Sequence, residues 1–151
     1  MYFELKQDIL DTIEDINDLF TVYESLFETI KQNEPNKIEL AALATIFHSF
    51  YNGVENIFLL VSKQIDNDTP IGSTWHQSLL NQMIQITGDR TQIISPDTAS
   101  ALAPYLKFRH FFRHAYAFVL DWKRIKPLAD DLTSVWNSIK KDIVTFCDTC
   151  G

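Results

Sequence analysis

The sequence predicts an all-α protein, folded as an antiparallel bundle of four to five helices. Apolar residues recur at steps of three and four along most of the chain, which is typical of amphipathic helices. Only four Gly and five Pro occur among the 151 residues, so the elements between turns should be long. No segment alternates with period two for the length of a strand. An apolar content of 46% with eleven Phe is globular, and the length fits a single domain over residues 1–151.

Two long helices are expected in the first half of the chain. Apolar residues at regular spacing predict one continuous amphipathic helix over residues 2–30, and the segment 33–36 breaks it. Asn36 followed three residues later by Glu39 resembles a capping box, which marks the start of a helix. The apolar stripe of this second helix continues to Ile65.

Proline and turn residues divide the second half. Ser95 followed by Pro96 is a helix start, with the Ser as N-cap and the Pro at the first helical position. We expect Pro104 to kink or restart that helix and Pro127 to open the last one. The expected elements are therefore a turn at 66–72 and helices at about 73–86, from Ser95, at 104–122 and from Pro127.

Charge is distributed unevenly in this acidic chain of net charge −7. Residues 104–126 contain six Lys or Arg and a single acidic residue, Asp121. One basic segment in an acidic body is typical of a localised anion site, although chance clustering beside a dimer interface would give the same pattern. No apolar run approaches the roughly 20 residues of a membrane span, and the N-terminus lacks the features of a signal peptide. We therefore expect a cytoplasmic protein without membrane contact.

Cysteine usage gives little functional signal. Cys147 and Cys150 form a single Cys-x-x-Cys, which is half of a zinc site, and no second pair completes it. We expect two reduced thiols at the surface.

A helix over 104–122 would have two chemically distinct faces. With Arg109 at zero on a wheel of 100° per residue, the apolar face consists of Phe108, Phe111, Ala115, Phe118, Val119 and Trp122. The opposite face consists of Arg109, His110, Arg113, His114 and Tyr116. Histidine suits proton transfer near neutrality, and arginine offers a fixed fork to phosphate oxygens. A solvated basic face would explain the charges alone, but Tyr116 and Leu120 on it favour contact with a partner.

Arg109, His114 and Tyr116 have a diagnostic spacing. Arg109-x4-His114-x-Tyr116 resembles the Arg-x4-to-6-His signature of HEPN ribonucleases, in the Arg-x4-His-x-Tyr form of HepT toxins. His110, directly after the arginine, also fits that family. Residues 51–58 and 75–83 are similar to helices of HepT proteins, and the resemblance covers roughly residues 36–145.

The resemblance implies the HEPN fold and a metal-independent endoribonuclease toxin that needs no cofactor and acts on RNA as a homodimer. His114 would be the general base or acid, and Arg109 would neutralise charge on the phosphorane. Tyr116 and the basic neighbours would support RNA binding; these neighbours are Lys107, His110 and Arg113.

Control by a partner is also implied. A cognate MntA-type nucleotidyltransferase antitoxin would inactivate the toxin by adenylylating Tyr116. The alternative is a non-catalytic HEPN-like binding partner of a nucleotidyltransferase. Outside the signature, we expect His48 to lie at the edge of the core and His76 to cap or pack. Glu55 either supports the helix of the signature by hydrogen bonds or is solvated.

Overall fold

The computed structural model of the protein describes residues 2–114 and 120–150, with only the backbone of Arg113 and His114. Over these residues the chain forms α-helices and one π-helical turn, and no strand, which confirms the all-α prediction. The elements are α1 (Phe3–Val22), α2 (Glu24–Gln32), α3 (Lys37–Val61), the π-helical turn η1 (Ser62–Asp66), α4 (Trp75–Met83), α5 (Pro96–His114) and α6 (Trp122–Thr149).

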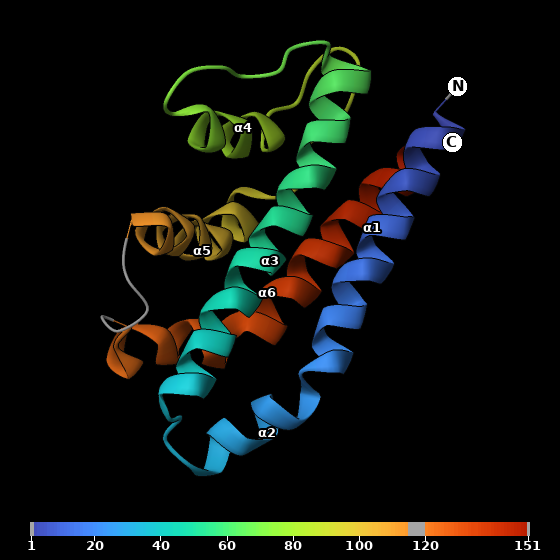
Figure 1. The fold of residues 1–151 in the computed structure, drawn as a ribbon. Coiled ribbons are helices and arrows are strands. Elements are labelled where there is room, and N and C mark those ends of the chain that lie inside the picture. Colours follow the sequence, from blue (N-terminus) through green and yellow to red (C-terminus); the bar gives the residue numbers. More distant parts are fainter. Residues whose placement is uncertain (1, 115–119, 151) are drawn as a thin grey trace.

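The long helix α3 lies at the centre of the bundle. Figure 1 shows α1 and α6 along one side of α3, with α1 running opposite to both, and α4 and α5 on the other side. The helix begins with the expected capping box, in which Asn36 and Glu39 exchange side-chain to backbone hydrogen bonds of 2.9 Å. Every residue of its predicted apolar stripe is buried: Leu43, Phe47, Phe50, Val54, Ile57, Val61 and Ile65.

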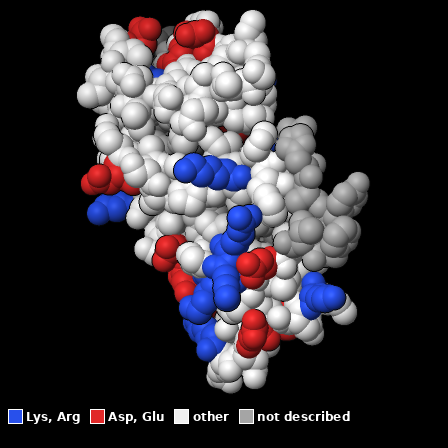
Figure 2. Space-filling model, turned by 90° about the vertical axis from the view of Figure 1, so that its left-hand side faces the viewer, with Lys and Arg blue, Asp and Glu red and all other residues white. Residues whose placement is uncertain are grey.

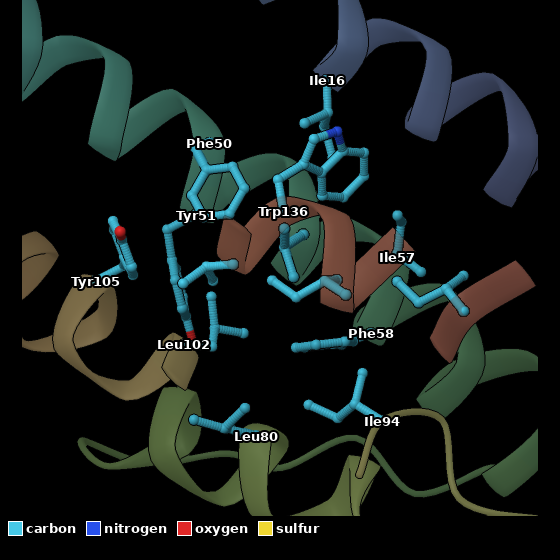
Figure 3. Packing of buried hydrophobic residues seen from close by; sticks show 14 of the residues in the cluster. Ile16, Phe50, Tyr51, Ile57, Phe58, Leu80, Ile94, Leu102, Tyr105 and Trp136 are labelled. Carbon is cyan, nitrogen blue, oxygen red and sulfur yellow. The ribbon is translucent and has the colours of Figure 1, made fainter. Parts of the chain in front are cut away.

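Aromatic rings fill the space between α1, α3 and α6. Phe50 of α3 meets Trp136 of α6 edge to face, with ring centroids 6.1 Å apart (Figure 3). The indole N–H of Trp136 donates to Asn17 on α1 at 2.8 Å. Gly53 lets α1 approach α3, because a Cβ there would lie 2.8 Å from a side-chain carbon of Ile16. The core is therefore closed by side chains from three long helices.

The first predicted helix is interrupted, so the expectation of one helix over residues 2–30 is wrong. α1 ends at Val22 and α2 begins at Glu24, and Tyr23 between them has φ −103° and ψ 15°. Two β-branched residues, Thr21 and Val22, precede the break, and such residues are weak helix formers. The apolar spacing continues past a one-residue break, so periodicity alone did not reveal it.

The helix boundaries near the basic segment also differ from the prediction. α5 runs without interruption from Pro96, capped by the Ser95 hydroxyl, which accepts from the Thr98 N–H at 3.1 Å. Pro104 lies inside this helix and does not restart it. The expected helix over 104–122 is wrong at its end, because Asp121 is extended and begins α6.

The last helix begins earlier than Pro127. The Asp121 carboxylate accepts from the backbone N–H of Lys123 at 3.1 Å, so Asp121 is the N-cap of α6 and Pro127 is its sixth residue. Trp122 and Leu120 therefore do not belong to α5, and their expected places on its two faces are wrong. Both side chains are half-buried against the core.

A buried ion pair stabilises the turn after α3. The Arg90 guanidinium donates to both carboxylate oxygens of Asp66, at 2.6 and 2.8 Å, and the two side chains are 2% and 7% exposed. Arg90 also donates to three backbone carbonyl oxygens, those of Gln82, Gln85 and Thr91. These bonds tie η1 and α4 to the segment between α4 and α5.

The thiol of Cys147 is buried in the core, so the expectation of two surface thiols is wrong for that residue. Cys147 follows Phe146 on the apolar stripe of α6, and burial raises its pKa to about 11. Cys150 is half-buried, and both cysteines are free. Among the described helices, none is long and apolar enough to cross a bilayer.

Candidate active site around Arg109

Arg109 lies on the face of α5 that turns toward α3 and α4, and its side chain is half-buried. Its Nε donates to Asn52 Oδ1 on α3 at 3.1 Å, and its Nη1 lies 3.3 Å from His76 Nε2 on α4. The wheel placed Arg109 on the face opposite the apolar residues, and its side chain is half-buried there. The guanidinium is fixed at the meeting point of three helices.

His76 connects Arg109 to a buried carboxylate. Its Nδ1 lies 2.7 Å from Glu55 Oε2, and the Glu55 side chain is only 6% exposed. A guanidinium can only donate, so Nε2 of His76 must accept the bond from Arg109. We therefore assign the neutral tautomer, in which the Nδ1–H of His76 donates to Glu55. His76 has a larger role than the capping or packing expected of it, and Glu55 is bonded rather than solvated.

The positive charge of Arg109 has no direct counter-charge in the described part of the chain. No carboxylate of these residues lies within 4.0 Å of its guanidinium, and its two hydrogen-bond partners are a neutral amide and an imidazole. Arg90, by contrast, is paired with Asp66 through two bonds. Nη2 of Arg109 makes no hydrogen bond to any of the described residues. Arg109 is thus held in place while its charge stays available to an anion.

The hydroxyl of Tyr51 lies in the same region of α3. It is buried and has no hydrogen-bond partner within the described residues. Burial raises the pKa of Tyr51, the Glu55 charge raises it further, and the Arg109 charge acts against both. The opposed charges of Glu55 and Arg109 therefore both act on this phenol, which stays protonated.

A pocket of about 590 Å³ opens beside Arg109, and we call it the Arg109 pocket. Residues 72–77, from the turn before α4 and its first turn, line one side, and Leu106, Lys107, Arg109 and His110 of α5 line the other. Its size falls in the range of small-ligand sites. Two positively charged side chains thus reach a hollow formed by α4 and α5.

The basic segment forms a surface band on this side of the molecule. Exposed cations are Lys107 on α5 and Lys123, Arg124 and Lys126 on the first turns of α6. Figure 2 shows Lys and Arg side chains gathered over the middle and lower part of this face, with acidic groups between them. Lys126 is paired with Asp130 at 2.6 Å, so part of the charge is compensated.

The predicted site residues are only partly described by the structure. Lys107 and His110 are exposed and line the Arg109 pocket, together with Arg109 itself. Arg113 and His114 are the last two residues of α5, and their side chains lie outside the described part. Tyr116 also lies outside the described residues. His48 is half-buried, with its ring 5.9 Å from that of Phe112, as expected of a residue at the core edge.

Asn52 is the site residue that sequence reasoning missed. It occurs inside the segment 51–58 that resembles HepT helices, but nothing in its own spacing marked it. Glu55 and His76 had a weak signal, because a carboxylate interrupts an apolar stretch of α3 and a histidine follows Trp75 at the start of α4. Their meeting with Arg109 depends on how α3, α4 and α5 pack.

Over the described residues, the fold and this pocket define a helical protein with a fixed arginine on α5 that no carboxylate pairs. Comparison with protein families identifies the group: the model of the family described as HepT-like protein matches residues 42–150. The chain belongs to this HepT-like family, which confirms the resemblance drawn from its sequence. Comparisons with curated proteins and with solved structures gave no significant match.

Proposed function

We propose that this protein is an endoribonuclease toxin that cleaves RNA without a metal ion, with Arg109 and His114 as its catalytic residues. The observation that carries the proposal is the fixed Arg109 guanidinium, held by Asn52 and His76 with no carboxylate partner in the described residues. Membership of the HepT-like family supports it. Donors fixed in advance are effective at stabilising charge that grows in a transition state.

In the proposed reaction, the 2′ oxygen of a ribose bonds to the adjacent phosphorus and the bond from phosphorus to the 5′ oxygen breaks. His114 moves a proton, as a base toward the 2′-OH or as an acid toward the departing 5′ oxygen. Arg109 neutralises the charge on the phosphorane, and Lys107, His110 and Arg113 support RNA binding. The products carry a 2′,3′-cyclic phosphate and a 5′-OH, so DNA should not be cleaved.

We further propose that two copies form a two-fold homodimer that brings their α5 helices together. Such a contact would combine two basic segments against the acidic body. A mostly apolar hollow of about 340 Å³ between α5 and the first turns of α6 supports an interface there, with Phe108, Phe111 and Leu120 among its lining residues.

Cleavage of total RNA in excess EDTA is the test of the proposed function. The wild-type protein should cut RNA and leave 5′-OH ends, whereas His114→Ala should lose cleavage and keep the wild-type circular dichroism spectrum. Cleavage that requires added divalent metal, or that survives the loss of His114, would contradict the proposed mechanism. No cleavage at all would favour the non-catalytic binding partner. Sedimentation equilibrium of the same sample should give twice the 17.5 kDa of one chain.

Inactivation by a nucleotidyltransferase antitoxin is the second part of the proposal. Coexpression with the cognate enzyme should add AMP to Tyr116, detected by mass spectrometry of the peptide that contains it. A phosphodiester there adds negative charge and bulk close in sequence to Arg109 and His114, so cleavage should fall. Tyr116→Phe keeps the ring without the acceptor oxygen and should escape modification. AMP found only on other residues would refute Tyr116 as the acceptor.

A further inference from the structure

The Arg109 pocket combines features that suit a nucleotide. Its lining contains Lys107 and Arg109 and, among the described residues, no Asp or Glu. Four other hollows on the surface each include at least one acidic residue. In a chain with twenty acids and thirteen Lys and Arg, an acid-free hollow with two cations is a place where an anion can bind.

An aromatic platform lies in the same pocket. The rings of Trp75 and His76 have centroids 3.6 Å apart and an interplanar angle of 31°, and the indole is half-buried. His76 is fixed by Glu55 and Arg109, so the ring behind the indole has a defined position. Bases of single-stranded nucleic acids stack on such side chains. The first turn of α4 also lines the pocket, and its N-cap Thr74 makes no side-chain capping bond.

We propose that the Arg109 pocket binds one nucleotide of a single-stranded RNA, with its base against Trp75 and its phosphate at Lys107 and Arg109. The volume of about 590 Å³ is sufficient for a nucleotide. This inference rests on the proposed ribonuclease function, because it names the part of the substrate that lies beside the cleaved bond. Trp75 and Lys107 are binding residues in it, and Ser73 and Gln77 are further polar residues of the pocket lining.

The test is binding of a fluorescent, 2′-O-methylated oligoribonucleotide, which has no free 2′-OH and cannot be cleaved. Trp75→Leu should weaken binding about tenfold or more, since stacking of one base contributes roughly 1–3 kcal/mol. Trp75→Phe keeps an aromatic ring and should retain most of the affinity. Because Trp75 contacts His76, the thermal unfolding midpoint of both variants is measured alongside.

A second variant makes the test independent of the indole. Lys107→Gln should reduce the slope of log Kd against log salt by about 0.7, the value for one phosphate contact on a single strand. Lys63→Gln is the matched control, because this exposed lysine lines a different hollow with Asp8 and Asp11. Its affinity and salt slope should equal those of the wild type.

The outcomes separate this inference from the proposed function. In one outcome, the wild-type protein cleaves RNA while Trp75→Leu and Lys107→Gln bind the oligonucleotide with unchanged affinity. That result would refute the nucleotide site in the Arg109 pocket and would not contradict the proposed ribonuclease function. If the wild-type protein does not cleave RNA but its oligonucleotide binding depends on Trp75, the ribonuclease function is refuted and the nucleotide site is supported. Competition by free AMP as effective as by the oligonucleotide would overturn the assignment to an RNA strand.

Discussion

Asn52→Asp should reduce RNA cleavage almost as strongly as Arg109→Ala, by about 10²- to 10³-fold in kcat/KM. The substitution keeps the shape of the side chain that accepts from Arg109 at 3.1 Å, but it places a carboxylate there. An ion pair would form at the guanidinium and compete with the phosphate of RNA for it. The charge of Arg109, which the described part of the chain leaves uncompensated, would then no longer be available.

The thermal unfolding midpoint distinguishes this loss of activity from damage to the fold. Asn52→Asp should not lower the thermal unfolding midpoint, because the half-buried guanidinium gains a counter-charge. Asn52→Ala removes one hydrogen bond without adding charge, so its loss of activity should be smaller than that of Asn52→Asp. Lys141→Ala, which removes an exposed cation from α6, should cleave at the wild-type rate. Wild-type cleavage by Asn52→Asp would show that the charge of Arg109 is not used.

Asp66→Ala should lower the free energy of unfolding by about 3–5 kcal/mol. The substitution leaves the Arg90 guanidinium buried without its carboxylate, at a position where its side chain is 2% exposed. The three backbone carbonyls that Arg90 also bonds cannot neutralise a full charge. Urea denaturation followed by circular dichroism measures the change.

Two further variants check that the lost pair is the cause. Asp89→Ala removes an exposed acid one residue before Arg90 and should change stability by less than about 0.5 kcal/mol. Asp66→Ala combined with Arg90→Met should be more stable than Asp66→Ala alone, because no unpaired charge remains buried. A loss below about 1 kcal/mol in Asp66→Ala would mean that water or another group solvates the arginine.

Arg90 and Arg109 differ in whether a carboxylate of the described residues pairs with their charge. Arg90 is paired through two bonds with Asp66, and its charge is used to hold the turn after α3. Arg109 is held by two uncharged acceptors, so its position is fixed at little cost to its attraction for an anion. In the sequence, Arg90 lies in a polar segment and Arg109 lies in the signature, and neither position reveals which side chain will bond the arginine. Their partners come from other helices and distinguish them.

The helical class and the main apolar stripes could be predicted from the sequence alone, and the chain spacing of Arg109, His114 and Tyr116 can be read from it directly. These are local properties, because apolar spacing, the capping box of Asn36 and Glu39 and the signature spacing each involve residues a few positions apart. Local signals gave a wrong helix boundary where two of them indicated different starts for the same helix. Pro127 indicated a helix start, yet the helix begins five residues earlier at Trp122, because the Asp121 carboxylate caps it there.

How Arg109 is held and what surrounds it depend on contacts between helices that are distant in the chain. Asn52, Glu55, His76 and Arg109 come from three helices, and bonded partners are up to 57 positions apart in the chain. No periodicity relates residues on different helices, and which side chains meet depends on how α3, α4 and α5 pack. The burial of Cys147 and the contacts of His76 with Glu55 and Arg109 likewise depend on atoms distant in the chain.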